Sequence, residues 1–199
     1  MERTDYELII VGAGPVGLAC AIAAQRAGIE YVALERGCVV NSVFRFPTQM
    51  TFFTTPELME IGEHPLVAGP FGKPTRSEAL DYYRGVTRAE DLNVRTYEDV
   101  HSVEGEKGAF RVSATHKGRT RDFTSELVVL ATGYYDCPNY LGIPGEDLPH
   151  VNHYYTEAHP HSGQKVLVVG GANSACVSSL DLYRRGADVT LVHRGDRFA

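Results

Sequence analysis

One glycine-rich pattern occurs twice in this chain, and its two copies align with each other without a gap. The first copy occupies residues 9–17 and the second occupies residues 167–175, so that Gly12 falls on Gly170. In each copy a short apolar run ends at a glycine and precedes a helix-like segment and a second apolar run. This order is typical of a strand, a tight turn, a helix and a parallel strand. The duplication therefore predicts an α/β chain with two Rossmann-like units.

In the first copy, each glycine has its own function. Gly12 makes the tight turn, Gly14 lets backbone N–H groups approach a pyrophosphate, and Gly17 allows the helix to pack on the strand. Pro15 suits the first turn of the helix, where its missing N–H costs no hydrogen bond. The helix N-terminus offers aligned N–H groups and the positive end of its dipole to phosphates. We therefore expect this copy to bind the pyrophosphate of a dinucleotide.

The residues that end the second apolar run differ in charge between the copies. The first copy reaches Glu35 and Arg36, and the second reaches His193 and Arg194 at the aligned positions. An acid there accepts a hydrogen bond from a ribose 2′-hydroxyl, whereas a basic residue suits a 2′-phosphate. A guanidinium also pairs well with phosphate. We expect a nucleotide with a free 2′-hydroxyl at Glu35 and Arg36, and NADPH at Arg194.

The second copy is less regular than the first. Ala175 replaces the third glycine, which the fingerprint permits, whereas Ala172 at the middle position directs a methyl group towards the pyrophosphate. We expect NADPH binding to be retained, but weakened or changed in angle. The candidate NADPH contacts are Gly170, Gly171, Asn173, Ser174, Ala175 and Arg194.

A third motif lies between the two copies, where an apolar run at residues 127–130 ends in Ala131-Thr132-Gly133. It resembles the motif that closes the FAD half of two-dinucleotide flavoproteins. A small Thr-Gly pair lets the backbone lie close to a ligand or to a domain junction. The order of the three motifs therefore indicates FAD first, with Thr132 and Gly133 near it, and NADPH second.

The remaining pattern predicts a three-layer fold with a parallel sheet and an added antiparallel meander. Four segments are expected to be parallel strands: residues 7–11, 31–35, 93–96 and 127–131, of which the first and last are apolar runs typical of buried strands. Three runs separated by glycines indicate the meander: residues 99–104, 110–115 and 120–124. Thr75 and Glu78 form a capping-box pattern that predicts the start of a helix.

This organisation divides the chain into three parts. We assign residues 1–141 to the N-terminal part of a FAD-binding domain and residues 142–163 to an interdomain linker. Residues 164–199 are the start of an NADPH-binding domain whose C-terminal part is missing, so we expect the chain to be a fragment of a longer protein.

Composition excludes several functions. A formal net charge of −6 argues against a nucleic-acid partner, and no apolar run approaches the roughly 20 residues of a membrane span. The chain enters its first strand directly, so we expect no signal peptide. Four cysteines without a CxxC pair indicate reduced thiols and a cytoplasmic protein. The histidines of residues 150–161 match no structural zinc spacing, so we expect no metal.

Five specific stretches extend the resemblance over the whole chain: residues 40–48 (VNSVFRFPT), 51–56 (TFFTTP), 131–135 (ATGYY), 153–160 (HYYTEAHP) and 170–175 (GGANSA). With them the chain resembles the pyridine-nucleotide disulfide oxidoreductase superfamily in its thioredoxin-reductase-like branch. It is most similar there to the YpdA-type bacillithiol disulfide reductases. The resemblance implies FAD, NADPH, a homo-oligomer and reduction of a low-molecular-weight disulfide such as bacillithiol disulfide. It also implies Val100 near the adenine of FAD and Thr48 at the isoalloxazine.

One position departs from the family and leaves the catalytic residue unknown. The family has a cysteine directly after the Gly-x-Gly-Pro turn, where this chain has Val16. Valine has no thiolate, and Cys20 lies a helical turn further on. Hydride transfer from NADPH to flavin is therefore the main expectation. Two alternatives stay open, which are a flavin-containing monooxygenase of the Asn-Ser-Ala type and a non-catalytic FAD-binding fragment.

Overall fold

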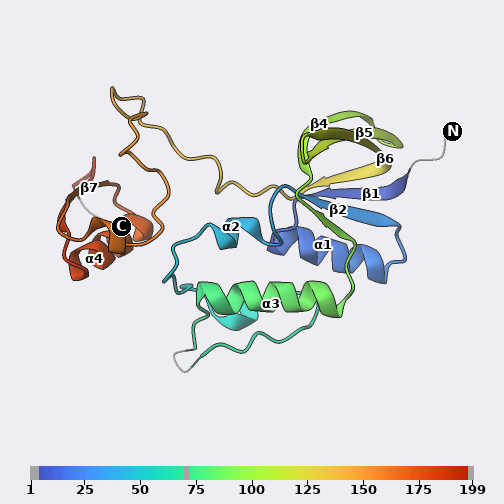
Figure 1. The fold of residues 1–199 in the computed structure, drawn as a ribbon. Coiled ribbons are helices and arrows are strands. Elements are labelled where there is room, and N and C mark those ends of the chain that lie inside the picture. Colours follow the sequence, from blue (N-terminus) through green and yellow to red (C-terminus); the bar gives the residue numbers. More distant parts are fainter. Residues whose placement is uncertain (1–4, 70–71, 197–199) are drawn as a thin grey trace. The chain divides into compact units, whose positions relative to one another are not determined.

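The structure is a computed structural model that describes residues 5–69 and 72–196 (Figure 1). The described residues fall into two compact units. The first is drawn from Met1–Arg45 and Met50–Asn139, and the second from Phe46–Gln49 and Tyr140–Ala199. The assignment of FAD to residues 1–141 and of NADPH to residues 164–199, with a linker between them, stays a prediction.

The first unit contains a six-stranded mixed sheet in the order β3-β2-β1-β6-β5-β4. Its strands are β1 (Tyr6–Val11), β2 (Tyr31–Glu35), β3 (Val94–Thr96), β4 (Asp99–Glu106), β5 (Ala109–His116) and β6 (Arg119–Leu130). Strands β3, β2, β1 and β6 are parallel, whereas β4, β5 and β6 form an antiparallel meander. The predicted α/β class, parallel sheet and meander are confirmed.

The prediction of two separate strands at residues 120–124 and 127–131 is wrong, because β6 is one continuous strand. Its first half pairs with β5 and its second half pairs with β1. The change of partner falls at Ser125, which is opposite Phe110 on one side and Tyr6 on the other. Strand β6 therefore ties the meander directly to the parallel sheet.

Two long helices accompany the sheet of the first unit. Helix α1 (Pro15–Arg26) packs on β1 and β2 (Figure 1). Helix α3 (Arg76–Ala89) begins with the predicted capping box, in which Thr75 Oγ1 accepts from the Glu78 N–H and Glu78 Oε2 accepts from the Thr75 N–H. The Tyr83 hydroxyl donates to the Met59 carbonyl at 2.9 Å, and burial raises the pKa of Tyr83 to about 12.

The irregular stretch between β2 and α3 contains two short helices, α2 (Asn41–Phe44) and η1 (Pro56–Leu58). The hydroxyl of Tyr82 donates to the His64 carbonyl at 2.7 Å, which ties part of this stretch to α3. Helix α2 follows Val40, which is buried and has a positive φ of 50°. The N–H of Val40 donates to the Ala13 carbonyl at 2.9 Å, so α2 is held against the first glycine loop.

The second unit is a parallel strand–helix–strand unit made of β7 (Lys165–Val169), α4 (Asn173–Arg184) and β8 (Asp188–Val192). A short helix, η2 (His159–His161), precedes it. Its core is formed by Ala158, Leu182 and Ala187, with the inner faces of both strands packed against them. None of the helices in residues 5–69 and 72–196 is long and apolar enough to cross a membrane.

Candidate nucleotide-binding site

The carboxyl ends of β1, β2 and β6 lie at one edge of the sheet. In the register of the sheet, Val11 is opposite Leu34 of β2 and Leu130 of β6. The loops that follow these strands therefore leave the sheet together. Strands β2 and β6 lie on opposite sides of β1, so the chain changes direction here. In open α/β sheets, ligands bind at such a switch point, outside the carboxyl ends of the strands.

Two glycines of the first loop are required by close packing of the backbone. Gly12 has a φ of +104°, and a Cβ built on it would lie 2.5 Å from the Ala131 carbonyl oxygen. A Cβ on Gly17 would lie 2.0 Å from the Gly12 carbonyl oxygen. Neither position can carry a side chain, so the tight turn and the close helix packing expected from the sequence are both present.

Gly14 differs from Gly12 and Gly17, because a Cβ built on it would meet no described atom within 4 Å. Packing within the protein therefore does not explain a glycine there. Gly14 is the N-cap of α1, and the first turn of this helix carries no acidic side chain. Free N–H groups and open space at a helix N-terminus fit the phosphates of a dinucleotide.

Glu35 links the glycine loop to the loop after β2. Its side chain is buried, with Oε2 accepting from the Ala13 N–H and Oε1 from the Gly37 N–H, both at 2.8 Å. A carboxylate has about four lone-pair directions, so the group can accept a further hydrogen bond from a ribose hydroxyl. The expected contact between Glu35 and the adenosine ribose stays a prediction.

Arg36 forms an ion pair with Asp136, a residue that the sequence patterns do not single out. The second oxygen of Asp136 accepts from Arg45 Nη1 at 2.8 Å. Asp136 follows the Ala-Thr-Gly motif by a few residues, whereas both arginines follow β2. This contact joins parts of the chain that are distant in sequence, so no local spacing could have predicted it.

The other expected FAD contacts lie in different places. Thr132 and Gly133 are exposed after β6, and Gly133 has a φ of +66°. Val100 lies on β4 and packs against the core cluster that contains Leu34. Thr48 belongs to the second unit, where its N–H donates to the Thr156 carbonyl at 2.9 Å. Their contacts with FAD stay predictions.

The second unit repeats the geometry of the first. The Gly170 N–H donates to the Val192 carbonyl at 2.9 Å, as the Gly12 N–H donates to the Leu34 carbonyl at 2.7 Å. Helices α1 and α4 have the same length of 12 residues and begin at aligned positions. The turns that end them both contain a glycine with positive φ, Gly28 and Gly186.

The third position of the second glycine pattern accommodates its alanine. The Ala175 side chain lies beside Gly170, because a Cβ built on Gly170 would lie 3.0 Å from the Ala175 Cβ. Asn173 and Ser174 are exposed in the first turn of α4. These four residues, Gly170, Asn173, Ser174 and Ala175, therefore lie at the loop and helix N-terminus where the sequence predicts NADPH.

His193 occupies the position in the second unit that Glu35 occupies in the first. A Cβ on Gly171 would lie 2.3 Å from His193 Nδ1, so the imidazole lies directly against the glycine loop. Arg194 follows it and is exposed. An exposed guanidinium at a strand end is available to a 2′-phosphate, and this role of Arg194 stays a prediction.

Position 16 carries no thiol, and the four cysteines of the chain lie at other positions. Val16 is 69% exposed in the first turn of α1. The four cysteines are free, and only Cys137 among them is well exposed. Burial raises the pKa of the Cys38 thiol, which keeps it protonated at neutral pH and weakens it as a nucleophile. Among the described residues, no group of three histidine, cysteine or acidic side chains gathers as metal ligands would.

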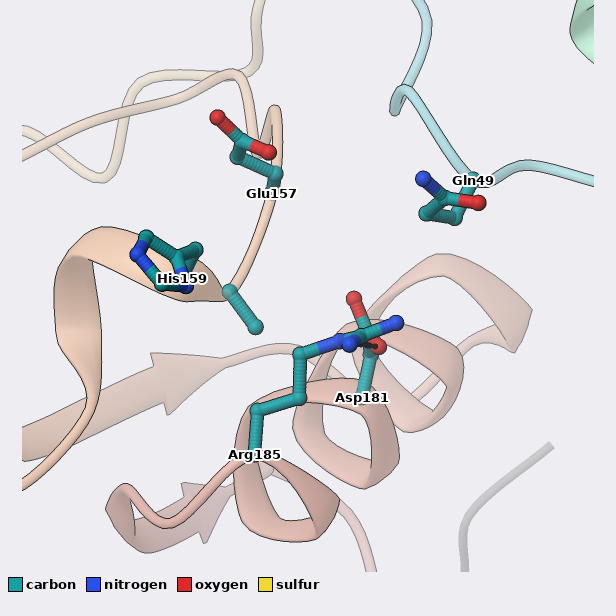
Figure 2. Close-up of a pocket in the computed structure, with 6 residues that line it drawn as sticks. Gln49, Glu157, His159, Asp181 and Arg185 are labelled. Atoms are coloured by element: carbon teal, nitrogen blue, oxygen red, sulfur yellow. Dashed lines mark hydrogen bonds and ion pairs between the residues drawn. The ribbon is translucent and has the colours of Figure 1, made fainter.

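The second unit also contains a polar pocket of about 220 Å³ (Figure 2). It is lined by Gln49, Glu157, Ala158, His159, Asp181 and Arg185. Asp181 is already paired, because it accepts from the Tyr155 hydroxyl and from Arg185 Nε, the latter at 3.1 Å. Burial and this hydrogen bond raise the pKa of Tyr155. None of the expected nucleotide contacts lines this pocket.

These features define an α/β protein with two Rossmann-type strand–helix–strand units. The family model described as pyridine nucleotide-disulphide oxidoreductase matches residues 9–199, and the chain belongs to this family. The superfamily and fold expected from the sequence are therefore confirmed.

Individual relatives agree with the family. The chain is 41% identical over 191 residues to the bacilliredoxin reductase Bdr of Bacillus subtilis, covering 96% of this chain and 58% of that protein. The solved structure of the bacillithiol disulfide reductase Bdr (YpdA) from Bacillus cereus superposes with a TM-score of 0.94 at 40% identity, covering 98% of this chain and 60% of that one. A flavin monooxygenase from Stenotrophomonas maltophilia shares the fold, with a TM-score of 0.83 at 23% identity, covering 96% of this chain and 58% of that one. The chain thus spans about three fifths of the length of these relatives.

Proposed function

We propose that the full-length protein is a FAD-dependent oxidoreductase that accepts hydride from NADPH. The observation that carries the proposal is the glycine loop, where Gly12 and Gly17 are required by packing and Gly14 leaves open space at a helix N-terminus. The family match and the 41% identity to Bdr support the same function.

In this proposal each part of the site has a separate task. The N–H groups at the start of α1 bind the pyrophosphate of FAD, and Glu35 accepts a hydrogen bond from the adenosine ribose. Arg194 binds the 2′-phosphate of NADPH beside the second glycine loop. The flavin supplies the redox chemistry when it is bound, and the protein positions the two nucleotides.

We further propose that the electrons pass to a small-thiol disulfide, because the names of the Bdr relatives refer to bacillithiol disulfide and to bacilliredoxin. The valine at position 16 implies that this step does not use a cysteine in the first turn of α1. We also propose a cytoplasmic homo-oligomer, as the resemblance to this family implies.

The test uses the full-length protein under anaerobic conditions. Purified protein is expected to be yellow, and NADPH is expected to bleach the flavin absorbance near 450 nm, which bacillithiol disulfide then restores. Protein that stays colourless after incubation with FAD would contradict the proposal. Bleaching by NADPH without reoxidation by the disulfide would contradict only the choice of substrate.

A monooxygenase is the second candidate, because Asn173-Ser174-Ala175 resembles a motif of flavin monooxygenases and the chain shares its fold with one of them. Consumption of NADPH and O₂ in equal amounts, with an oxygenated product, would favour it. Release of hydrogen peroxide without an oxygenated product would not favour it. Tight FAD binding with no reduction by NADPH would instead favour a non-catalytic FAD-binding protein.

A further inference from the structure

Two loops flank the first glycine loop, the one after β2 (residues 36–40) and the one after β6 (residues 131–136), and within residues 5–69 and 72–196 no backbone–backbone hydrogen bond joins them. Strands β2 and β6 lie on opposite sides of β1, so their loops are separated by the glycine loop that follows β1. Each flank is fixed to this central loop. On the β2 side, the Ala13 N–H donates to the Glu35 carboxylate and the Ala13 carbonyl accepts from the Val40 N–H. On the β6 side, Gly12 packs closely on the Ala131 carbonyl.

Asp136 connects the two flanks to each other. Its carboxylate, on the β6 side, binds Arg36 and Arg45, which both lie on the β2 side. The neighbouring Tyr135 hydroxyl donates to the Arg45 carbonyl at 3.3 Å and strengthens the same connection. The side chain of Asp136 is only 23% exposed, so its charge is partly shielded from water between the two guanidinium groups.

We propose that Asp136 is a positioning residue of the flavin site. By holding Arg36 and Arg45, it fixes the loop after β6 to the loop after β2 and thereby supports the retention of the FAD pyrophosphate at Gly14. This inference rests on the proposed function, because it assumes that FAD binds at the first glycine loop.

The chain offers a matched control in Asp122. This aspartate also pairs with an arginine, since Oδ2 lies 3.3 Å from Arg111 Nη1, and Oδ1 accepts from the Ser113 hydroxyl at 2.7 Å. It lies where β5 pairs with β6 in the meander, and not at the carboxyl edge of the parallel strands. A substitution there removes a comparable surface ion pair without touching the two flanks.

The experiment compares Asp136→Asn, Asp136→Glu and Asp122→Asn in the full-length protein. We expect Asp136→Asn to raise the Kd for FAD about five- to tenfold, since two partly exposed ion pairs are lost. Asp136→Glu, which keeps the charge, should have a Kd for FAD within about threefold of the wild-type value. Asp122→Asn should leave the wild-type Kd unchanged. The visible circular dichroism of the bound flavin should change only in Asp136→Asn.

Arg45→Gln provides a second variant, which removes only the ion pair between Arg45 and Asp136. It should raise the Kd for FAD by a smaller factor than Asp136→Asn does. Equal FAD affinity in wild type and Asp136→Asn, or a loss that Asp136→Glu does not rescue, would overturn the inference and leave the proposed function intact. A wild-type protein that binds no FAD would contradict both.

Discussion

The imidazole ring of His193 occupies the space that a side chain on Gly171 would need, with Nδ1 only 2.3 Å from the position of such a Cβ. In the first unit the aligned pair is Glu35 and Ala13, where the carboxylate instead accepts from the backbone N–H. The residue at the end of the second strand thus decides whether the glycine loop can carry a methyl group at this position. The imidazole of His193 leaves no room for a methyl group on Gly171. The Glu35 carboxylate, which accepts from the Ala13 N–H, leaves room for the methyl group of Ala13.

Gly171→Ala should therefore displace His193 and disturb the second glycine loop. We expect a loss of about 1–3 kcal/mol in the free energy of unfolding, typical of overpacking, and weaker NADPH binding. Thermal melting and fluorescence titration with NADPH would measure both effects. Gly85→Ala is the control, because Gly85 lies within α3 with no described atom near its Cβ, and it should stabilise the helix by about 1 kcal/mol. An unchanged melting temperature in Gly171→Ala would contradict the packing of His193.

Glu35→Ala should weaken FAD retention and also destabilise the apoprotein. The substitution leaves the N–H groups of Ala13 and Gly37 without their acceptor, at a cost of about 1–3 kcal/mol each where they are buried. Equilibrium dialysis with FAD and urea unfolding would measure the two losses. Glu7→Ala is a matched control, since Glu7 accepts the Glu30 N–H at the other end of β1, and its FAD affinity should be unchanged. Normal FAD affinity in Glu35→Ala would remove Glu35 from the site.

The repeat was predictable from the sequence because its determinants are local. A glycine with positive φ, an apolar run and a helix start are each encoded within a few residues, and Gly12 and Gly170 occupy the expected turns. The union of two expected strands into β6 was not predictable, because it depends on which partner pairs on each side of Ser125. Likewise, the contacts of Asp136 join loops that are brought together only by the order of the strands.

The linker region should lose stability in acid because of Glu146. Its carboxylate bonds the His153 ring at 3.0 Å and accepts from the N–H groups of Leu141 and Gly142, which together hold the pKa of Glu146 at about 2. A depressed pKa stabilises the folded state above the ordinary value of 4.5, and this stabilisation is lost as the pH falls from there towards 2.

Nuclear magnetic resonance of the amides of Leu141 and Gly142 between pH 6 and 2 would follow this loss directly. The Glu146→Gln variant has no carboxylate at this position, so its amides should lack the low-pH titration step that Glu146 produces in the wild type. A wild-type titration midpoint near 4.5 would show that these hydrogen bonds do not hold the charged form.

Arg194→Ala should change the choice of nucleotide. Loss of a charge-assisted hydrogen bond costs about 1.5–3 kcal/mol, or roughly 10- to 150-fold in affinity, and it should fall on NADPH and not on NADH. Titration of the full-length variant with both nucleotides would measure the ratio, which Glu35→Ala should leave unchanged. An equal loss for NADPH and NADH would mean that Arg194 does not contact the 2′-phosphate.

Val16→Cys tests whether the missing thiol limits disulfide reduction. Position 16 is 69% exposed in the first turn of α1, where the helix N-terminus favours a thiolate and lowers a cysteine pKa. We expect the variant to gain one thiol that reacts with a disulfide reagent faster than Cys38, whose pKa is raised by burial. Val16→Ser is the control without a thiolate. If wild type, Val16→Cys and Val16→Ser reduce bacillithiol disulfide equally fast, the reaction needs no cysteine at this position, and electrons must reach the disulfide from the flavin by another route.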